Sequence, residues 1–216
     1  MPPSAPGPSA NADRKVAIVD LQVCNLNSIR NMLRRLGAEP VVVADAAGID
    51  AARRLVLPGV GHFDAVMDRV ESAGIRDALQ RAAIDRGVPT LGICVGMQIM
   101  TRGSAEGRAR GLGWFEGTCE RFPALAGLRV PHMGWNTLAP NRHRALFDGL
   151  GPDARFYFVH SYQVRASVPA EVAASAEYGV EFAAALAKGN VAGVQFHPEK
   201  SHRFGMRVLE NFLTRF

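Results

Sequence analysis

Residues 89–98 read Pro-Thr-Leu-Gly-Ile-Cys-Val-Gly-Met-Gln, an apolar run that ends in the motif Gly-x-Cys-x-Gly. This is the layout of a nucleophile elbow, with the sulfur of Cys94 in the place of a serine oxygen. Gly92 and Gly96 suit such a turn because it is tight and strained, and side chains there would collide with the neighbouring strand and helix. We therefore predict a strand that leads into the cysteine and a helix directly after it.

Short apolar or β-branched runs on either side of this motif alternate with segments of helical period, which is typical of an α/β protein. In the first half, strands are expected at 15–20, 40–44, 54–57 and 89–93. One helix is expected from a cap at Asn27 or Ser28 to a stop at Gly37, and another over 63–86. This order is the beginning of a doubly wound fold.

The second half of the chain predicts strands that need not be parallel. A hairpin is expected over 114–122 with Gly117-Thr118 in its middle, and another from 182 to 196 around the turn Gly189-Asn190. Further strands are expected at 156–164 and 172–177, and a closing amphipathic helix at 203–216. We predict an α/β fold with a mostly parallel mixed central sheet flanked by helices, in one domain over 14–216.

The composition indicates a folded chain, because 48% of its 216 residues are apolar and 21% are charged. Residues 1–13 have neither a basic start nor an apolar stretch, so we expect a disordered tail and no signal peptide. No apolar run reaches the roughly 18 residues that a membrane-spanning helix needs, so no membrane association is expected. The net charge of +5 comes from scattered basic residues, which does not favour nucleic-acid binding.

The three cysteines, Cys24, Cys94 and Cys119, are far apart and odd in number. This spacing favours neither a disulfide framework nor a CxxC metal site. We therefore expect a cytoplasmic protein, in a reducing compartment, with no bound metal.

Cys94 is the candidate nucleophile. The elbow presents it at the carboxyl end of the sheet, where such folds bind ligands. The helix that begins at Val95 adds the positive end of its dipole and free N–H groups, which favour a thiolate and can hold an oxyanion. A buried structural cysteine is the alternative.

A nucleophilic thiol needs a base, and the triplet His197-Pro198-Glu199 supplies one after an apolar strand. The proline rigidifies the turn that brings Glu199 back toward the imidazole, where a carboxylate fixes the tautomer. Residues 58–61, Pro-Gly-Val-Gly, follow another strand and can turn a backbone N–H toward an oxyanion. A plain strand-to-helix turn is the alternative for that loop, and it is not a phosphate loop because no Gly-Lys-Ser/Thr follows.

Together, the stretches 58–61, 92–98 and 197–200 resemble the class-I glutamine amidotransferases, and the resemblance covers residues 14–216. Within that class, 131–136 (Pro-His-Met-Gly-Trp-Asn) and 156–162 (Phe-Tyr-Phe-Val-His-Ser-Tyr) resemble the glutaminase subunits of imidazole glycerol phosphate synthases. The last two motifs discriminate better, because the elbow and the His-Pro-Glu triplet are shared across the class.

The resemblance implies a role for each matching residue and no cofactor. In the triad, Cys94 is the nucleophile, His197 the acid and base, and Glu199 its orienter. The other implied residues are Gly59, Val60 and Val95 at the oxyanion; Gln98, Ser161 and Tyr162 at the α-amino and carboxylate groups of glutamine; and Pro131, His132, Trp135, Asn136 and Lys200 at a partner. That partner is a (βα)8-barrel synthase of histidine biosynthesis, which receives unprotonated ammonia through a tunnel.

Two segments depart from the family pattern. Residues 20–25 lack both glycines of the usual Asp-Tyr-Gly-x-Gly-Asn, and 201–205 replace a shorter Ser-x-x-Gly. The ammonia acceptor is therefore open, with a surface-sugar amidotransferase as one alternative. A stand-alone cysteine hydrolase and a non-catalytic interaction subunit are further alternatives, although intact Cys94, His197 and Glu199 argue against the second.

Overall fold

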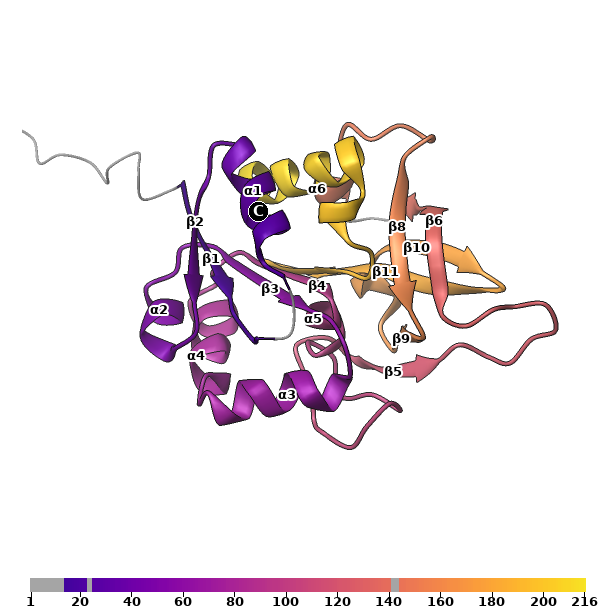
Figure 1. Ribbon diagram of the computed structural model, residues 1–216, viewed down its shortest axis with the longest axis horizontal. Helices are drawn as coiled ribbons and strands as arrows, with labels where there is room; N and C mark the ends of the chain where they lie inside the picture. Colours follow the sequence, from indigo (N-terminus) through magenta and orange to yellow (C-terminus); the bar gives the residue numbers. More distant parts are fainter. Residues whose placement is uncertain (1–13, 23–24, 141–143) are drawn as a thin grey trace, which may run out of the picture.

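The computed structural model describes residues 14–22, 25–140 and 144–216, and the expected N-terminal tail and Cys24 lie outside them. The main sheet has the order β2-β1-β3-β4-β12-β11-β10-β7, with β9 and β5 joined to it through β11 (Figure 1). Its first five strands are parallel to one another. They are β1 (Lys15–Val19), β2 (Glu39–Val43), β3 (Leu55–Gly59), β4 (Thr90–Cys94) and β12 (Val191–Val194). The expected doubly wound beginning and the mixed central sheet are confirmed.

The other strands of this sheet are antiparallel. They are β11 (Val180–Lys188), β10 (Val172–Tyr178), β7 (Ala139–Pro140), β9 (Tyr162–Ala166) and β5 (Gly117–Arg121). The expected β11–β12 hairpin around Gly189 is confirmed. A separate two-stranded sheet pairs β6 (His132–Thr137) with β8 (Arg155–His160). The strand expected over 156–164 is thus two strands, β8 and β9, which meet at Ser161 and belong to different sheets.

The expected hairpin over 114–122 is wrong. Only β5 forms there, and its partner is β9. Gly117 is not a turn residue: a Cβ on it would overlap the carbonyl oxygen of Arg165, so the glycine allows β9 to approach closely. Trp114 and Phe115 precede the strand as buried loop residues.

Helices cover the parallel part of the sheet from both sides (Figure 1). α1 and α6 lie on one side, and α2, α3 and α4 on the other. Their bounds are α1 (Asn27–Arg35), α2 (Ala46–Asp50), α3 (Phe63–Ser72), α4 (Arg76–Gln80) with a π-helical turn (Arg81–Asp85), α5 (Val95–Gln98) and α6 (His202–Arg215). Short 3₁₀ turns lie at Arg144–Phe147, Pro169–Glu171 and Pro198–Lys200.

Two helix boundaries differ from expectation. The segment 63–86 is not one helix, because Gly74 takes a φ of +64° in a turn that separates α3 from α4. Helix α1 begins at Asn27 without a side-chain cap from Asn27 or Ser28. Instead, the Asn25 side chain accepts a hydrogen bond from the Asn27 N–H at 3.0 Å, in a local turn before the helix.

The part of the chain that the structure describes has no helix long and apolar enough to cross a membrane. The same residues contain no cluster of three His, Cys, Asp or Glu side chains that could hold a metal ion.

Candidate active site

The elbow is built from backbone contacts that only glycine permits. Cys94 ends β4 with a φ of +56°, and α5 begins at the next residue. A Cβ on Gly96 would overlap the carbonyl oxygen of Leu57 on β3. A Cβ on Gly92 would lie 2.7 Å from the carbonyl oxygen of Gly96. The glycines therefore let the strand, the turn and the helix pack on β3, and this packing holds the cysteine in its strained conformation.

The His197 loop is fixed to β8 by two hydrogen bonds and braced by a third within the loop. The His197 N–H donates to the Tyr157 carbonyl at 2.9 Å. The Ser201 hydroxyl donates to the His197 carbonyl at 2.7 Å and accepts from the Tyr157 N–H at 3.0 Å. Because β12, which precedes this loop, is the direct neighbour of β4, the imidazole lies at the same sheet edge as Cys94.

His197 is buried and pairs with the partly buried Glu199. Nδ1 of the imidazole lies 2.7 Å from Oε1 of the carboxylate and donates to it, so Nε2 is the ring nitrogen left for the cysteine. Burial lowers the pKa of His197, but the hydrogen bonds and charges of Cys94 and Glu199 outweigh it and raise that pKa to about 9. The imidazolium is therefore the form of His197 that this geometry favours near neutral pH.

Glu199→Gln is expected to move the titration of His197 to lower pH, because the variant removes one of the two groups that raise its pKa. For the wild type, the folded protein holds a proton on His197 between about pH 6.5 and 9 that the unfolded chain has lost. This contribution to stability is full below that window and is lost as the pH rises through it. NMR titration of the His197 ring measures the midpoint directly, and Glu177→Gln, at an exposed position on β10, is the control. An unchanged midpoint in Glu199→Gln would contradict the pairing.

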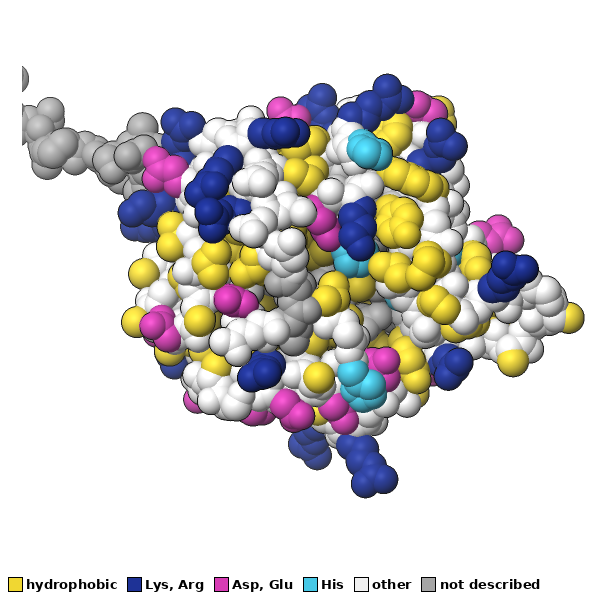
Figure 2. Space-filling view, in the orientation of Figure 1, with side chains coloured by type: hydrophobic (Ala, Val, Ile, Leu, Met, Phe, Trp, Pro, Cys, Tyr) yellow, Lys and Arg dark blue, Asp and Glu magenta, His cyan; other side chains and the backbone are white. Residues whose placement is uncertain are grey.

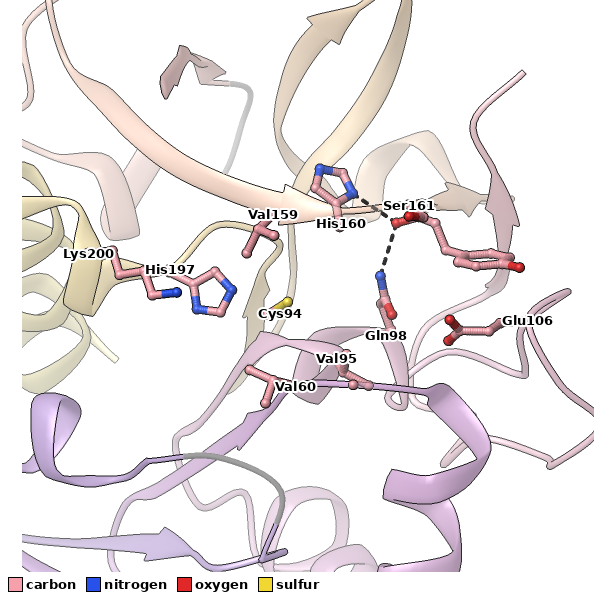
Figure 3. Close-up of a pocket in the computed structure, with 12 residues that line it drawn as sticks. Val60, Cys94, Val95, Gln98, Glu106, Val159, His160, Ser161, His197 and Lys200 are labelled. Atoms are coloured by element: carbon pink, nitrogen blue, oxygen red, sulfur yellow. Dashed lines mark hydrogen bonds between the residues drawn. The ribbon is translucent and has the colours of Figure 1, made fainter. Parts of the chain in front are cut away.

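A cavity of about 330 Å³ opens in front of Cys94 and His197 (Figure 3). Pockets for small molecules typically begin at about this size. Its other walls are Val60 and Gly61 after β3, Val95 and Gln98 on α5, Val159 to Tyr162 at the end of β8 and the start of β9, Glu106, and Lys200. The structure thus brings most of the expected triad, oxyanion and substrate-binding residues to one cavity.

The expected oxyanion residues lie on two sides of the nucleophile. Val60 and Val95 both line the cavity, and Val95 is the first residue of α5, where N–H groups have no partner within the helix. Gly59 is not among the residues that line the cavity. It is buried, and a Cβ on it would lie 3.0 Å from the Gly96 nitrogen. Its contribution is close packing of β3 on the elbow.

Gln98 is more constrained than its expected role implies. Its side-chain Nε2 donates to the Tyr162 carbonyl at 3.0 Å and to Oε1 of Gln195 at 2.9 Å. Both amide hydrogens are used, so the side chain can offer a substrate only its oxygen, as an acceptor. It can therefore take an ammonium or amide N–H, and it cannot donate to a carboxylate.

Glu106 was missed in the sequence. It is the only acidic side chain among the described residues that line the cavity, and its Oε2 accepts a hydrogen bond from the Phe63 N–H at 2.8 Å. Asp64 holds the same loop by accepting from the N–H groups of Arg108 and Ala109. A carboxylate in an irregular loop has no periodic signal, and only its contact with the start of α3 reveals its place.

The residues expected to face a partner are divided between surface and interior. Pro131, Trp135 and Lys200 are exposed, with Trp135 at 47%. Asn136 is half-buried and donates to the Glu177 carbonyl at 2.8 Å. The expectation for the His132 side chain is wrong: it is 3% exposed and stacks between Phe158 and Tyr178.

The described part of each unusual segment has a structural account. Gln22 stands where the family pattern has glycine and takes a φ of +57°, while its N–H donates to the Asp20 carboxylate at 2.8 Å. In 201–205, the His202 ring stacks on Trp135 with a centroid distance of 5.5 Å. Gly205 lies so close to the Pro198 carbonyl that a Cβ would overlap it, so α6 packs directly on the His197 turn.

A cysteine on a strained elbow, facing a histidine–glutamate pair from the neighbouring strand, defines a cysteine-dependent hydrolytic site on a doubly wound sheet. A family model described as glutamine amidotransferase class-I matches residues 17–216. The imidazole glycerol phosphate synthase subunit HisH of Bdellovibrio bacteriovorus is 46% identical over 200 residues, covering 91% of this chain and 98% of the relative. HisH 2 of Methanococcus maripaludis is 41% identical, with 93% and 99% covered.

Solved structures agree on the fold. PurLQS from Thermotoga maritima matches with a TM-score of 0.71 at 19% identity, covering 93% of this chain and 98% of that chain. A crystal structure of a glutamine amidotransferase matches with a TM-score of 0.69 at 22% identity, covering 92% and 96%. The chain belongs to the class-I glutamine amidotransferase family and, within it, to the family of HisH subunits of imidazole glycerol phosphate synthase.

Proposed function

We propose that this chain is the glutaminase subunit of an imidazole glycerol phosphate synthase. It hydrolyses glutamine to glutamate and ammonia, and the ammonia serves a synthase partner that makes imidazole glycerol phosphate and AICAR in histidine biosynthesis. The observation that carries the proposal is the convergence of Cys94 and His197 at one cavity, with Glu199 bonded to His197, in a chain 46% identical to a HisH subunit. A cytoplasmic location is part of the proposal.

In the first half of the reaction, the Cys94 thiolate attacks the carboxamide carbon of glutamine. The carbonyl oxygen takes the negative charge, which N–H groups at the start of α5 and in the Val60 loop, both at the cavity wall, are proposed to stabilise. His197, held by Glu199, donates its Nε2 proton to the leaving nitrogen. The carbon–nitrogen bond breaks, ammonia leaves, and a γ-glutamyl thioester remains on Cys94.

In the second half, water hydrolyses the thioester. His197 is now neutral at Nε2 and accepts a proton from the water as it attacks the same carbon. The carbon–sulfur bond breaks, glutamate leaves, and the thiolate–imidazolium pair is restored. Glu199 stabilises the imidazolium in both halves without giving up its own charge.

Glu106 and Gln98 supply the contacts expected of an amino-acid site. The Glu106 carboxylate and the Gln98 side-chain oxygen can both accept from the α-ammonium of glutamine. Backbone groups of Ser161 and Tyr162, at the same end of the cavity as Gln98 (Figure 3), are proposed to hold the α-carboxylate. Glutamine thus lies with its carboxamide toward Cys94.

Glu106→Gln is expected to raise KM for glutamine about tenfold or more while kcat is largely kept. The lost contact is charge-assisted and serves the ground state and the transition state alike. Steady-state glutamate release measures both constants. Glu120→Gln, at an exposed position on β5, is the matched control and should behave as the wild type. A fall in kcat at unchanged KM would remove Glu106 from substrate binding.

The partner is proposed to be a (βα)8-barrel synthase that docks beside the cavity. Hydrophobic side chains gather over β6 and β8 (Figure 2), where Met133 is 61% and Trp135 47% exposed. The Lys200 ammonium lies 5.6 Å from the centre of the Tyr157 ring, between this patch and the cavity. An apolar patch with a charged edge next to a site that releases ammonia suits a permanent subunit contact.

Glutamate release with and without the barrel synthase and its nucleotide substrate tests this function. We expect slow release from the isolated chain and a large increase when the synthase and its substrate are added. If the activity does not change with this synthase but rises with a surface-sugar amidotransferase, the second enzyme is favoured as the ammonia acceptor. Full turnover alone, on γ-glutamyl compounds larger than glutamine, would favour a stand-alone hydrolase.

A further inference from the structure

Gln195, two residues before His197, contacts the nucleophile directly. Its side chain is fully buried, and its Nε2 lies 3.7 Å from the sulfur of Cys94. Its Oε1 accepts the hydrogen bond from Gln98. The proposed mechanism gives this amide no role. Among the described residues, however, Gln195 and His197 are the polar side chains that interact with the sulfur.

The direction of this amide is fixed by a backbone carbonyl. The carbonyl oxygen of Tyr162 can only accept hydrogen bonds, so the Gln98 atom that faces it must be the N–H₂ group. The N–H₂ group of Gln98 also faces the side chain of Gln195, and because it can only donate, the Gln195 atom that it faces must be the oxygen. Consequently the N–H₂ group of Gln195 is the one that points at Cys94.

A second chain of hydrogen bonds reaches the same carbonyl. His160 Nδ1 lies 2.9 Å from the Tyr162 oxygen, and its Nε2 lies 3.0 Å from Nδ1 of His132. Burial lowers the pKa of His132 to about 4 and that of His160 to about 3, so both rings are neutral at physiological pH. The carbonyl that orients Gln98 and Gln195 is therefore itself held in place by donors from both sides.

We propose that Gln195 donates an N–H to the Cys94 sulfur, stabilises its thiolate form and fixes its direction of attack. The proposal rests on Cys94 as the nucleophile. A thiolate in a buried site needs donors, and a neutral amide supplies one without exchanging protons, which leaves His197 free to protonate ammonia. When the thioester forms, the sulfur loses its charge; when water breaks the thioester, the same N–H receives the returning thiolate.

The test is the pH profile of alkylation of Cys94 by iodoacetamide, followed on the Cys94 peptide by mass spectrometry. Only the thiolate reacts, so the midpoint reports ionisation and the high-pH plateau reports access. Gln195→Met keeps the shape but removes the donor, and we expect its midpoint to rise by about one pH unit, a roughly tenfold slower reaction below the midpoint. The assay needs neither glutamine nor a partner. A negative result would therefore contradict the role of Gln195 without contradicting the proposed glutaminase function.

Three further variants make the test specific. Gln98→Met/Gln195→Met replaces both amides by apolar groups, leaves no orphaned N–H, and should show the same shift if the single variant does not fold. Gln98→Met alone keeps the donor on the sulfur and should shift much less. Gln80→Met, whose amide accepts from the Trp114 indole away from the cavity, should not shift. If Gln195→Met and Gln98→Met/Gln195→Met both fold and both keep the wild-type midpoint, the proposal is wrong and Gln195 only packs against Cys94.

Discussion

Cys94→Ala is expected to reduce glutamate release to the assay background, a loss on the order of 10⁴-fold or more. The variant removes the thiol that is proposed to attack glutamine, so no thioester can form. The protein should still fold, because alanine keeps the Cβ in the turn, and the close contacts of Gly92 and Gly96 that build the elbow do not involve the sulfur. The measurement is glutamate release with the synthase partner and its substrate present, together with thermal unfolding.

Cys119→Ala is the matched control. Cys119 is buried on β5, and burial raises the pKa of its thiol to about 12, so it stays protonated and unreactive. Its variant should keep activity within a few-fold. If Cys94→Ala released glutamate at the wild-type rate, the assignment of the nucleophile would be wrong. Loss of activity in a folded Cys119→Ala would show that the assay responds to packing as well as to chemistry.

The parallel core could be predicted because its strands are continuous apolar runs. The runs at 15–20, 54–57 and 89–93 became β1, β3 and β4 within a residue or two. A strand that is buried on both faces of a parallel sheet needs apolar side chains at nearly every position. The proximity of Cys94 and His197 could be predicted for a related reason: Cys94 ends one such strand, His197 follows another, and parallel neighbours bring their carboxyl ends together.

The remaining features depend on contacts between segments that are distant in sequence. Gly117 was interpreted as a turn, but its lack of a side chain serves the approach of β9. The β6–β8 pair was missed because β6 carries a polar and glycine-containing sequence and leaves the main sheet. Glu106 and Gln195 gain their meaning from partners 43 and 97 positions away, Phe63 and Gln98. No local pattern encodes such pairs.

Gly96→Ala is expected to destabilise the protein by about 3 kcal/mol, the upper end of typical overpacking costs, and to abolish activity in whatever remains folded. The added methyl group would overlap the Leu57 carbonyl, and a backbone group cannot turn away as a flexible side chain can. Either β3 or the elbow must shift, and the elbow carries Cys94. Urea unfolding gives the stability, and alkylation of Cys94 reports the geometry of the elbow.

Gly103→Ala provides the comparison, because its Cβ would meet nothing closer than the Ala109 carbonyl at 3.6 Å. That variant should change stability by well under about 1 kcal/mol. A Gly96→Ala protein with wild-type stability would mean that β3 and α5 are not packed as described. A stable Gly96→Ala variant with no activity would show that the loss of stability and the loss of activity are independent. The fold would then tolerate the shift, while catalysis depends on the position of the Cys94 sulfur relative to His197. We expect both losses together, because the contact that the methyl group breaks is the one that positions the nucleophile.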